Sequence, residues 1–206
     1  MTHTAESLQA AFKYLWLEEV AAIKQLAQSL PNNPVVVNIG AGAGTSGLAF
    51  MESRKDLWLI TIDIESGDSP FGSLLAEQRI IKDSLGVTSD FQRFTQIALD
   101  SVGVGNHWPP PGPIFPKRVD LVFIDGDHSY GGCKGDIEAW LPNIKPGGII
   151  AIHDYKKSEL YAHEKDYKDS APHPKDWPGV DKAVDELLVG KYEQVLRVKS
   201  LIAFRI

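Results

Sequence analysis

Short runs of consecutive apolar residues recur along the chain, and each predicts a β-strand. The four strongest runs are VVVNIG from residue 35, WLITIDIE from residue 58, VDLVFID from residue 119 and GGIIAIHD from residue 147. Continuous runs of this length are typical of strands buried on both faces of a parallel sheet. A further strand is expected at residues 91–99. The closing runs YEQVLRVK and LIAFRI, separated only by Ser200, predict a C-terminal pair of strands.

Between these runs the apolar residues follow helical spacing. Residues 4–30 repeat them every three or four positions, which predicts an amphipathic helix, broken once, that packs over an edge or end of the sheet. Helices are also expected at residues 73–85 and 179–188. Another helix is expected between the last two strong runs. Its apolar residues at helical spacing are Ile137, Trp140, Leu141 and Ile144. Pro146-Gly147-Gly148 should end it before the next strand.

This order of strands and helices predicts an α/β fold in a single domain over residues 1–206. Its central sheet should be mostly parallel, with an antiparallel C-terminal strand and helices on both faces. Residues 1–33 should form a helical cap. Each crossover from one parallel strand to the next should be right-handed.

Two stretches have neither pattern and are expected to be irregular and lid-like. Residues 102–118 hold five prolines and, with Trp108 and Phe115, would form either one wall of a substrate pocket or a rigid surface connection. Residues 156–178 are rich in Lys, Asp, His and Tyr and directly follow His153 and Asp154. These residues are therefore expected to form a second lid.

The composition narrows the class of protein. With 206 residues and 43% hydrophobic residues, the chain can bury the core of one domain. A net charge of −6 argues against a protein that binds the phosphate backbone of nucleic acid. The single cysteine, Cys133, cannot form an internal disulfide, and no apolar run resembles an export signal or a bilayer span. We expect a soluble, cytoplasmic protein without nucleic-acid or membrane partners.

A glycine-rich turn follows the first strong run. It reads Gly40-Ala41-Gly42-Ala43-Gly44-Thr45-Ser46-Gly47, and turns of this kind let a ligand approach the backbone N–H groups at a helix start. The next strand carries Asp63 about 20 residues further on, the distance at which an acid meets ribose hydroxyls. This order predicts a cofactor site. Asp100, after the strand at 91–99, would either line the pocket or cap a helix.

Five ionisable residues follow the third and fourth strong runs. They are Asp125, Asp127, His128, His153 and Asp154. Because ligands of open α/β sheets bind outside the carboxyl ends of the strands, these side chains should converge on one pocket mouth. A lone Asp or His there would more often cap a helix, but five such residues at neighbouring strand ends favour a reactive site.

The order of elements, with the motifs NIGAGAG, IDGDHSY and GGIIAIHD, resembles the class I S-adenosylmethionine-dependent methyltransferases over residues 34–206. It is most similar to the small-molecule branch related to macrolide-sugar O-methyltransferases and cephalosporin-hydroxylase-like proteins. In that branch an Asp-Gly-x-His-x-Tyr stretch precedes a Gly-Gly strand that ends in His-Asp. The resemblance implies a Rossmann-like fold and methyl transfer to a hydroxyl of a small molecule.

The resemblance also implies roles for individual residues. A divalent ion, Mg²⁺ or a similar metal, would be held by Asp125, His153 and Asp154, and His128 would be the general base, with His153 as a second catalytic candidate. S-adenosylmethionine would be bound by Asn38, Gly40, Ala41, Gly42, Gly44, Asp63, Ile64, Asp100, Ser101 and Asp125. Asn38 and His153 depart from the family, because both positions usually carry an acid there. Because His128 would lie at the start of a helix, where positive charge is disfavoured, we expect its imidazole to be largely neutral near pH 7.

Two other functions remain open at this point. Gly42, Gly44, Gly47 and Asp63 also fit an NAD(P)-dependent oxidoreductase, in which Tyr161 and Lys165 would mimic a Tyr/Lys pair. A non-catalytic protein that binds the methyl donor is the other alternative. A sugar hydroxyl, a phenol and a polyketide hydroxyl are all compatible acceptors, and a homo-oligomer is compatible with the sequence.

Overall fold

A computed structural model describes residues 3–64, 73–85, 93–112, 114–161 and 177–206. Its centre is a seven-stranded sheet in the order β3-β2-β1-β4-β5-β7-β6. The strands are β1 (Val35–Ile39), β2 (Trp58–Ile62), β3 (Phe94–Ile97), β4 (Val119–Ile124), β5 (Ile144–Ile152), β6 (Glu193–Val198) and β7 (Leu201–Arg205). All neighbours pair in parallel except β5 with β7 and β7 with β6. The predicted mostly parallel sheet with an antiparallel C-terminal end is confirmed.

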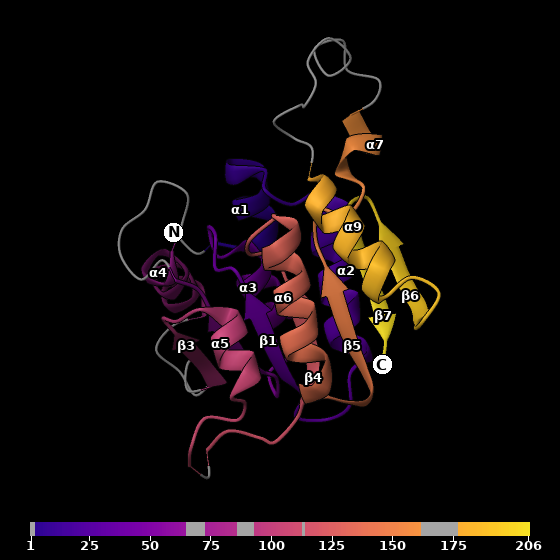
Figure 1. Cartoon of the computed structure of the whole chain (residues 1–206). Helices are drawn as coiled ribbons and strands as arrows, with labels where there is room; N and C mark the ends of the chain where they lie inside the picture. Colours follow the sequence, from indigo (N-terminus) through magenta and orange to yellow (C-terminus); the bar gives the residue numbers. More distant parts are fainter. Residues whose placement is uncertain (1–2, 65–72, 86–92, 113, 162–176) are drawn as a thin grey trace.

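Helices cover both faces of this sheet (Figure 1). On one face lie α5 (Ser101–Asn106), α6 (Tyr130–Trp140) and α9 (Pro178–Leu187). On the other lie α1 (Ala5–Phe12), α2 (Leu17–Ser29), α3 (Thr45–Ser53) and α4 (Leu74–Leu85). A short helix, α7 (Lys157–Tyr161), follows β5. In the described part of the chain, no helix is long and apolar enough to cross a membrane.

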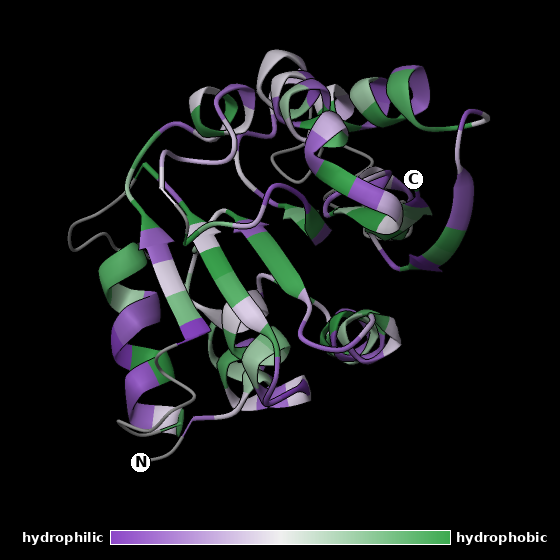
Figure 2. Ribbon diagram, turned by 90° about the horizontal axis from the view of Figure 1, so that it is seen from below, coloured by the Kyte–Doolittle hydropathy of each residue, from purple (hydrophilic) through white to green (hydrophobic). Residues whose placement is uncertain are grey.

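The central strands are mostly hydrophobic along their length (Figure 2), and their side chains pack into hydrophobic clusters on both faces of the sheet. In β1, Val35, Val37 and Ile39 pack under α5, α6 and α9, whereas Val36 faces α1 to α4. Every residue of β1 and β4 is buried. Two hydrophobic layers therefore press on one sheet, which accounts for the continuous apolar runs in the sequence.

The predicted break in the N-terminal helix is confirmed. Lys13 adopts a left-handed conformation and ends α1, and α2 begins after Trp16. The side chain of Glu19 accepts the Trp16 N–H at 2.8 Å and so caps the new helix from within its first turn. Both helices pack on α3, and residues 13–15 form the link between them.

Three sequence expectations are corrected by the structure. Ile144, expected in the helical stripe, is the first residue of β5, and Pro146-Gly147-Gly148 lies within that strand, because a 3₁₀ turn at Leu141–Asn143 already ends α6. Residues 102–106, the start of the stretch expected to be irregular, belong to α5, because Asp100 caps the first turn of this helix by accepting the Gly103 N–H.

The proline-rich stretch is also not a lid over the expected site. Its residues lead into the start of β4, so they lie at the amino end of the sheet, opposite the carboxyl ends (Figure 1). Trp108 stacks edge-on against Phe115, and both rings pack on the core. Of the second expected lid, residues 162–176 lie outside the described residues.

A carboxyl group from α4 is buried beneath the glycine-rich turn. Glu77 is fully buried and accepts hydrogen bonds from Thr61 Oγ1 at 3.0 Å and Gln96 Nε2 at 2.9 Å. Gly47 makes room for it, since a Cβ there would lie 2.1 Å from Glu77 Oε1. Burial raises the pKa of Glu77 to about 8, against the opposing effect of its hydrogen bonds with Gln96 and Thr61. The group is therefore neutral at pH 7.

Glu77→Gln should remove a pH-dependent cost from the fold. The folded chain keeps this proton up to pH about 8, whereas an unfolded Glu loses it near 4.5, so wild-type stability falls as pH rises between these values. The gap corresponds to a cost on the order of 5 kcal/mol above pH 8. Urea unfolding from pH 4 to 9 should show the variant gaining stability relative to wild type over that range. Glu138→Gln, on the exposed face of α6, is the control, and parallel pH curves for Glu77→Gln and wild type would contradict the assignment.

Candidate active site

The glycine-rich turn joins β1 to α3 and touches the end of β4. Gly40 has a φ of 92°, and a Cβ there would lie 2.2 Å from the backbone oxygen of Asp125. Only glycine fits such an approach in that conformation. Gly44, with a φ of 80°, is the N-cap of α3. The turn is thereby fixed beside the strand end that carries the ionisable cluster.

Two polar side chains hold the turn in place. Asp63 Oδ2 accepts the Ala41 N–H at 2.7 Å, which links the end of β2 to the turn. Asn38 is fully buried, donates to the Gly40 carbonyl at 3.3 Å and accepts from Ser46 Oγ at 3.2 Å. The side chain of Asn38, expected to contact a cofactor, lies beneath the turn and is used within it.

Four of the five predicted ionisable residues converge at the ends of β4 and β5. His128 Nε2 lies 3.1 Å from Asp154 Oδ2 and 3.4 Å from Asp125 Oδ1. His153 Nδ1 lies 3.1 Å from Asp125 Oδ1 and 3.1 Å from Asp154 Oδ1. Both carboxylates therefore contact both imidazoles.

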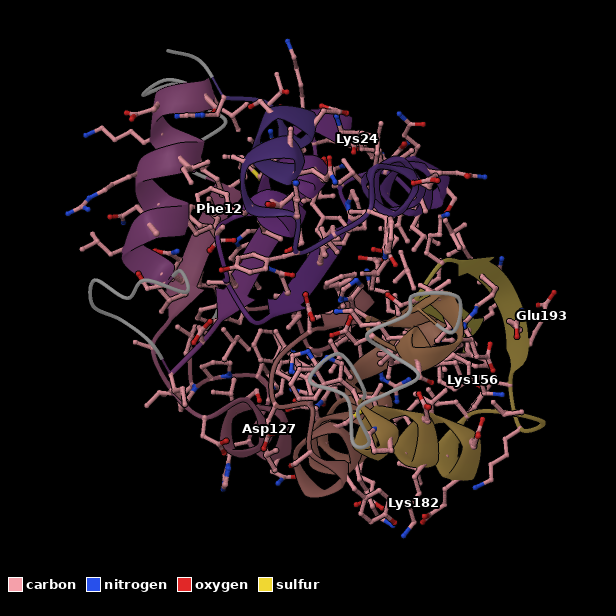
Figure 3. All side chains as sticks on the ribbon, turned by 90° about the horizontal axis from the view of Figure 1, so that it is seen from above. Phe12, Lys24, Asp127, Lys156, Lys182 and Glu193 are labelled. Carbon is pink, nitrogen blue, oxygen red and sulfur yellow. The ribbon has the colours of Figure 1, made fainter. Side chains whose placement is uncertain are left out.

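Asp127, the fifth residue, stays outside this cluster. It is exposed and accepts hydrogen bonds from the backbone N–H and the hydroxyl of Ser129, and in Figure 3 it lies at the start of α6. Ser129 in turn caps α6. Asp127 thus holds the residue that caps α6 and is not itself the cap.

The contacts within the cluster shift its proton affinities. Burial by itself would lower the pKa of His128, but the nearby Asp125 and Asp154 outweigh it and raise the pKa to about 9. Burial likewise opposes the charged form of His153, yet the same two carboxylates raise its pKa well above the usual range. The pKa values of Asp125 and Asp154 would be raised by burial and are instead lowered by the imidazoles, His153 foremost.

The contacts of His128 oppose the expectation that its imidazole is largely neutral near pH 7. The start of α6 does disfavour an imidazolium, but two carboxylates at contact distance act more strongly than a helix dipole. His128 carries a proton at pH 7 in this arrangement. A group that offsets the carboxylate charge is needed before His128 can accept a proton near neutral pH.

A cavity of about 530 Å³ joins the glycine-rich turn to the cluster. It is lined by Lys13, Tyr14, Leu15, Gly40, Ala41, Gly42, Ala43, Thr45, Ser46, Asp125, His128, His153, Asp154, Lys157 and Trp177. The ring of Trp177 stacks on that of His128 at 4.5 Å, and Lys157 Nζ lies 2.6 Å from Asp154 Oδ1. Tyr14, Lys157 and Trp177 were not predicted from the sequence as pocket residues.

Three other expected cofactor residues lie away from this cavity. Ile64 is 74% exposed just after β2. Asp100 is exposed as the cap of α5, and the neighbouring Ser101 donates its hydroxyl to Asp136. Asp100 borders a smaller apolar pocket of about 320 Å³ that includes Ile97 and Leu99. The side chains of Asp100 and Ser101 are thus used within the fold in this structure.

Asp125, His128 and Asp154 form the group that could hold a metal ion among the described residues. One ligand atom from each lies within 4.8 Å of the others. His128 Nε2 and Asp154 Oδ1 are buried and have no hydrogen bond of good geometry, despite their close ionic neighbours. Two carboxylates with one imidazole fit a divalent ion such as Mn²⁺ or Mg²⁺.

His153, expected as the third ligand, is not in that group. It is buried, and its two ring nitrogens face carboxylates on opposite sides, Glu19 Oε2 at 3.0 Å from Nε2 and the two aspartates at Nδ1. Both of its ring nitrogens are thus engaged by carboxylates, and one of these carboxylates, Glu19, lies outside the candidate metal group. The candidate group contains His128 where the resemblance had implied His153.

The comparison with protein families follows the same part of the chain. A family model described as "Methyltransferase domain" matches residues 37–155, from β1 to the end of β5. "Uncharacterized protein R132" of Acanthamoeba polyphaga mimivirus is 34% identical over 159 residues, which cover 76% of this chain and 62% of that protein. This chain therefore spans less than two thirds of the length of that relative.

Solved structures share the fold at low identity. The O-methyltransferase TomG from Streptomyces achromogenes, in complex with SAM, superposes with a TM-score of 0.63 at 17% identity, over 98% of this chain and 87% of that one. The Podospora anserina methyltransferase PaMTH1, bound to SAH, gives a TM-score of 0.65 at 17% identity, over 100% and 88%. Because the family model spans more than half of the residues, from the glycine-rich turn through the Asp125 and Asp154 cluster, the chain belongs to this methyltransferase domain family.

Proposed function

We propose that this protein transfers a methyl group from S-adenosylmethionine to a hydroxyl of a small molecule, assisted by a divalent ion and by His128. The observation that carries the proposal is the single cavity that joins the glycine-rich turn to Asp125, His128 and Asp154. A methyl donor on the turn would bring its sulfonium next to the cluster. An acceptor hydroxyl at the cluster would then meet it within the same cavity.

The donor would be held by the backbone of residues 40–44 and by Asp63. The turn presents N–H groups at the start of α3, and the Asp63 carboxylate faces the same turn through Ala41. S-adenosylmethionine supplies an electrophilic methyl group when bound. The chain's own task is then to place an acceptor oxygen in line and to relieve it of its proton.

The acceptor would lie against Tyr14 and Trp177, the two aromatic residues that line the cavity, of which Trp177 contacts the cluster through His128. Trp177 stacks on His128 and so keeps that imidazole oriented toward Asp125 and Asp154. A divalent ion at the two carboxylates would supply positive charge that acidifies a nearby hydroxyl. With that charge offset, His128 is placed to accept the hydroxyl proton. A sulfur-containing methyl donor, not a nicotinamide, is the cofactor we infer.

Cofactor affinity should depend on the charge of Asp63. In Asp63→Asn the amide oxygen can still accept the Ala41 N–H, but the charged acceptor for ribose hydroxyls is lost. We expect affinity for S-adenosylhomocysteine to fall by about 10- to 150-fold, or roughly 1.5–3 kcal/mol, by titration calorimetry. Asp127→Asn, which also neutralises a loop carboxylate but lies outside the cavity, is the control. Binding of NADH without either sulfur ligand would overturn the cofactor assignment.

Turnover should depend on a divalent ion held by Asp125 and Asp154. Excess EDTA should abolish methyl transfer, and Mn²⁺ or Mg²⁺ should restore it. Asp154→Asn should weaken the response to the ion by at least tenfold, since it removes one of two charged ligands. If the protein is fully active in EDTA, the metal has no part in the reaction.

His128→Ala should lower turnover by about 10²–10⁴-fold, the usual loss for a positioned base. Affinity for S-adenosylhomocysteine should stay within about threefold, because the turn and Asp63 are unchanged. His107→Ala, at the end of α5, controls for removal of a histidine elsewhere. Mn²⁺ binding measured in parallel separates two roles: a base leaves it intact, whereas loss of Mn²⁺ binding would make His128 a metal ligand and reject the base assignment.

A further inference from the structure

A buried carboxylate on α2 makes contacts that the proposed transfer site does not use. Glu19 is fully buried, and its Oε1 accepts the N–H of Ser200 at 2.8 Å and the hydroxyl of Ser200 at 2.7 Å. Its Oε2 accepts the Trp16 N–H at 2.8 Å and lies 3.0 Å from His153 Nε2. A carboxylate is rarely taken out of water to this degree unless it is paired, and this one is paired on both oxygens.

His153 connects Glu19 to the candidate metal group. The imidazole lies between carboxylates, with Glu19 on its Nε2 side and Asp125 and Asp154 on its Nδ1 side at 3.1 Å each. The two aspartates are the residues that would hold a divalent ion. Partners behind a metal ligand set its orientation, and a buried Glu–His pair is well suited to that task because neither group can turn away into water.

The same carboxylate also holds a wall of the cavity. The wall consists of Lys13, Tyr14 and Leu15, which line the cavity. The next residue, Trp16, donates its N–H to the Glu19 oxygen that contacts His153. Ser200 fixes the other oxygen at the turn between β6 and β7. The Glu19 side chain therefore connects the N-terminal wall of the cavity, the C-terminal hairpin and His153 of the cluster.

We propose that Glu19 is a positioning residue for methyl transfer, which acts through His153 to hold Asp125 and Asp154 in the arrangement that binds a divalent ion. It touches neither donor nor acceptor. The inference rests on the proposed function, because it needs the two aspartates to bind the ion. It assigns to the N-terminal helices a part in building the metal site, beyond covering the sheet.

The test is Mn²⁺ binding to the full chain, followed by the electron paramagnetic resonance signal of free Mn²⁺. Glu19→Gln keeps the size of the side chain but puts an NH₂ group where two hydrogen-bond donors now point. We expect Mn²⁺ affinity to fall 10- to 100-fold, which is about the effect of losing a partner behind a metal ligand. Glu18→Gln, on the exposed face of α2, should leave Mn²⁺ affinity unchanged. Calorimetry with S-adenosylhomocysteine should give wild-type affinity for both variants, which also shows that the cofactor turn is folded.

The route through His153 is tested by a double variant. If Glu19 acts through that imidazole, Glu19→Gln combined with His153→Gln should bind Mn²⁺ no more weakly than His153→Gln alone. Losses that multiply, or a Glu19→Gln protein with Mn²⁺ affinity within about threefold of wild type, would overturn the inference while leaving the proposed function intact. A wild-type protein that binds no Mn²⁺ would overturn the metal part of the proposed function and this inference with it.

Ser200→Ala serves if Glu19→Gln fails to fold. It removes one hydroxyl that donates to Glu19 Oε1 and lies 3.3 Å from His153 Nε2, and it keeps every charge in place. A smaller loss of Mn²⁺ affinity, about three- to tenfold, is expected from the looser Glu19. An unchanged affinity in a folded Ser200→Ala protein would count against a positioning role.

Discussion

Charge balance among three carboxylates and two imidazoles governs the carboxyl end of this sheet. Glu19 and Asp154 are buried, and Asp125 completes the set beside His128 and His153. The buried charges of Glu19, His153 and Asp154 would not be stable alone, so each depends on its neighbours for its ionised form. The raised pKa of both histidines and the lowered pKa of both aspartates express that dependence. A metal ion at this site would compete with the protons on these side chains.

The sheet was predictable because its strands are buried on both faces. Continuous apolar runs of four to eight residues at β1, β2, β4 and β5 have few alternatives once glycine and proline mark their ends. The carboxyl-end rule for parallel strands then brought Asp125, His128, His153 and Asp154 together correctly. Two predictions failed because of local signals. Asp100 caps a helix that extends into the stretch predicted to be irregular from its prolines, and a 3₁₀ turn ends α6 before Ile144.

Residue roles were harder to predict than positions. His153 lies outside the candidate metal group and contacts Glu19, which is 134 residues away from it in sequence and adjacent to it in space. A trace of this was visible, because Glu19 lies on the apolar stripe of its helix, three to four residues from Trp16 and Ile23. Glu77 lies in the same way between Leu74 and Ile81. An acid on the apolar face of a helix indicates a buried partner, but periodicity alone does not say which one.

The contact between Gly40 and the backbone of Asp125 has a consequence for how the two halves of the reaction are spaced. The turn would carry the methyl donor and the end of β4 carries the cluster, and the register that pairs Ile39 with Ile124 fixes one against the other. A slip of one residue would move them by about 3.3 Å along the strand. Misplacement by about 1 Å can already slow a reaction 10²-fold. The pairing of β1 with β4 in the core would thus set the distance between the methyl donor and the acceptor.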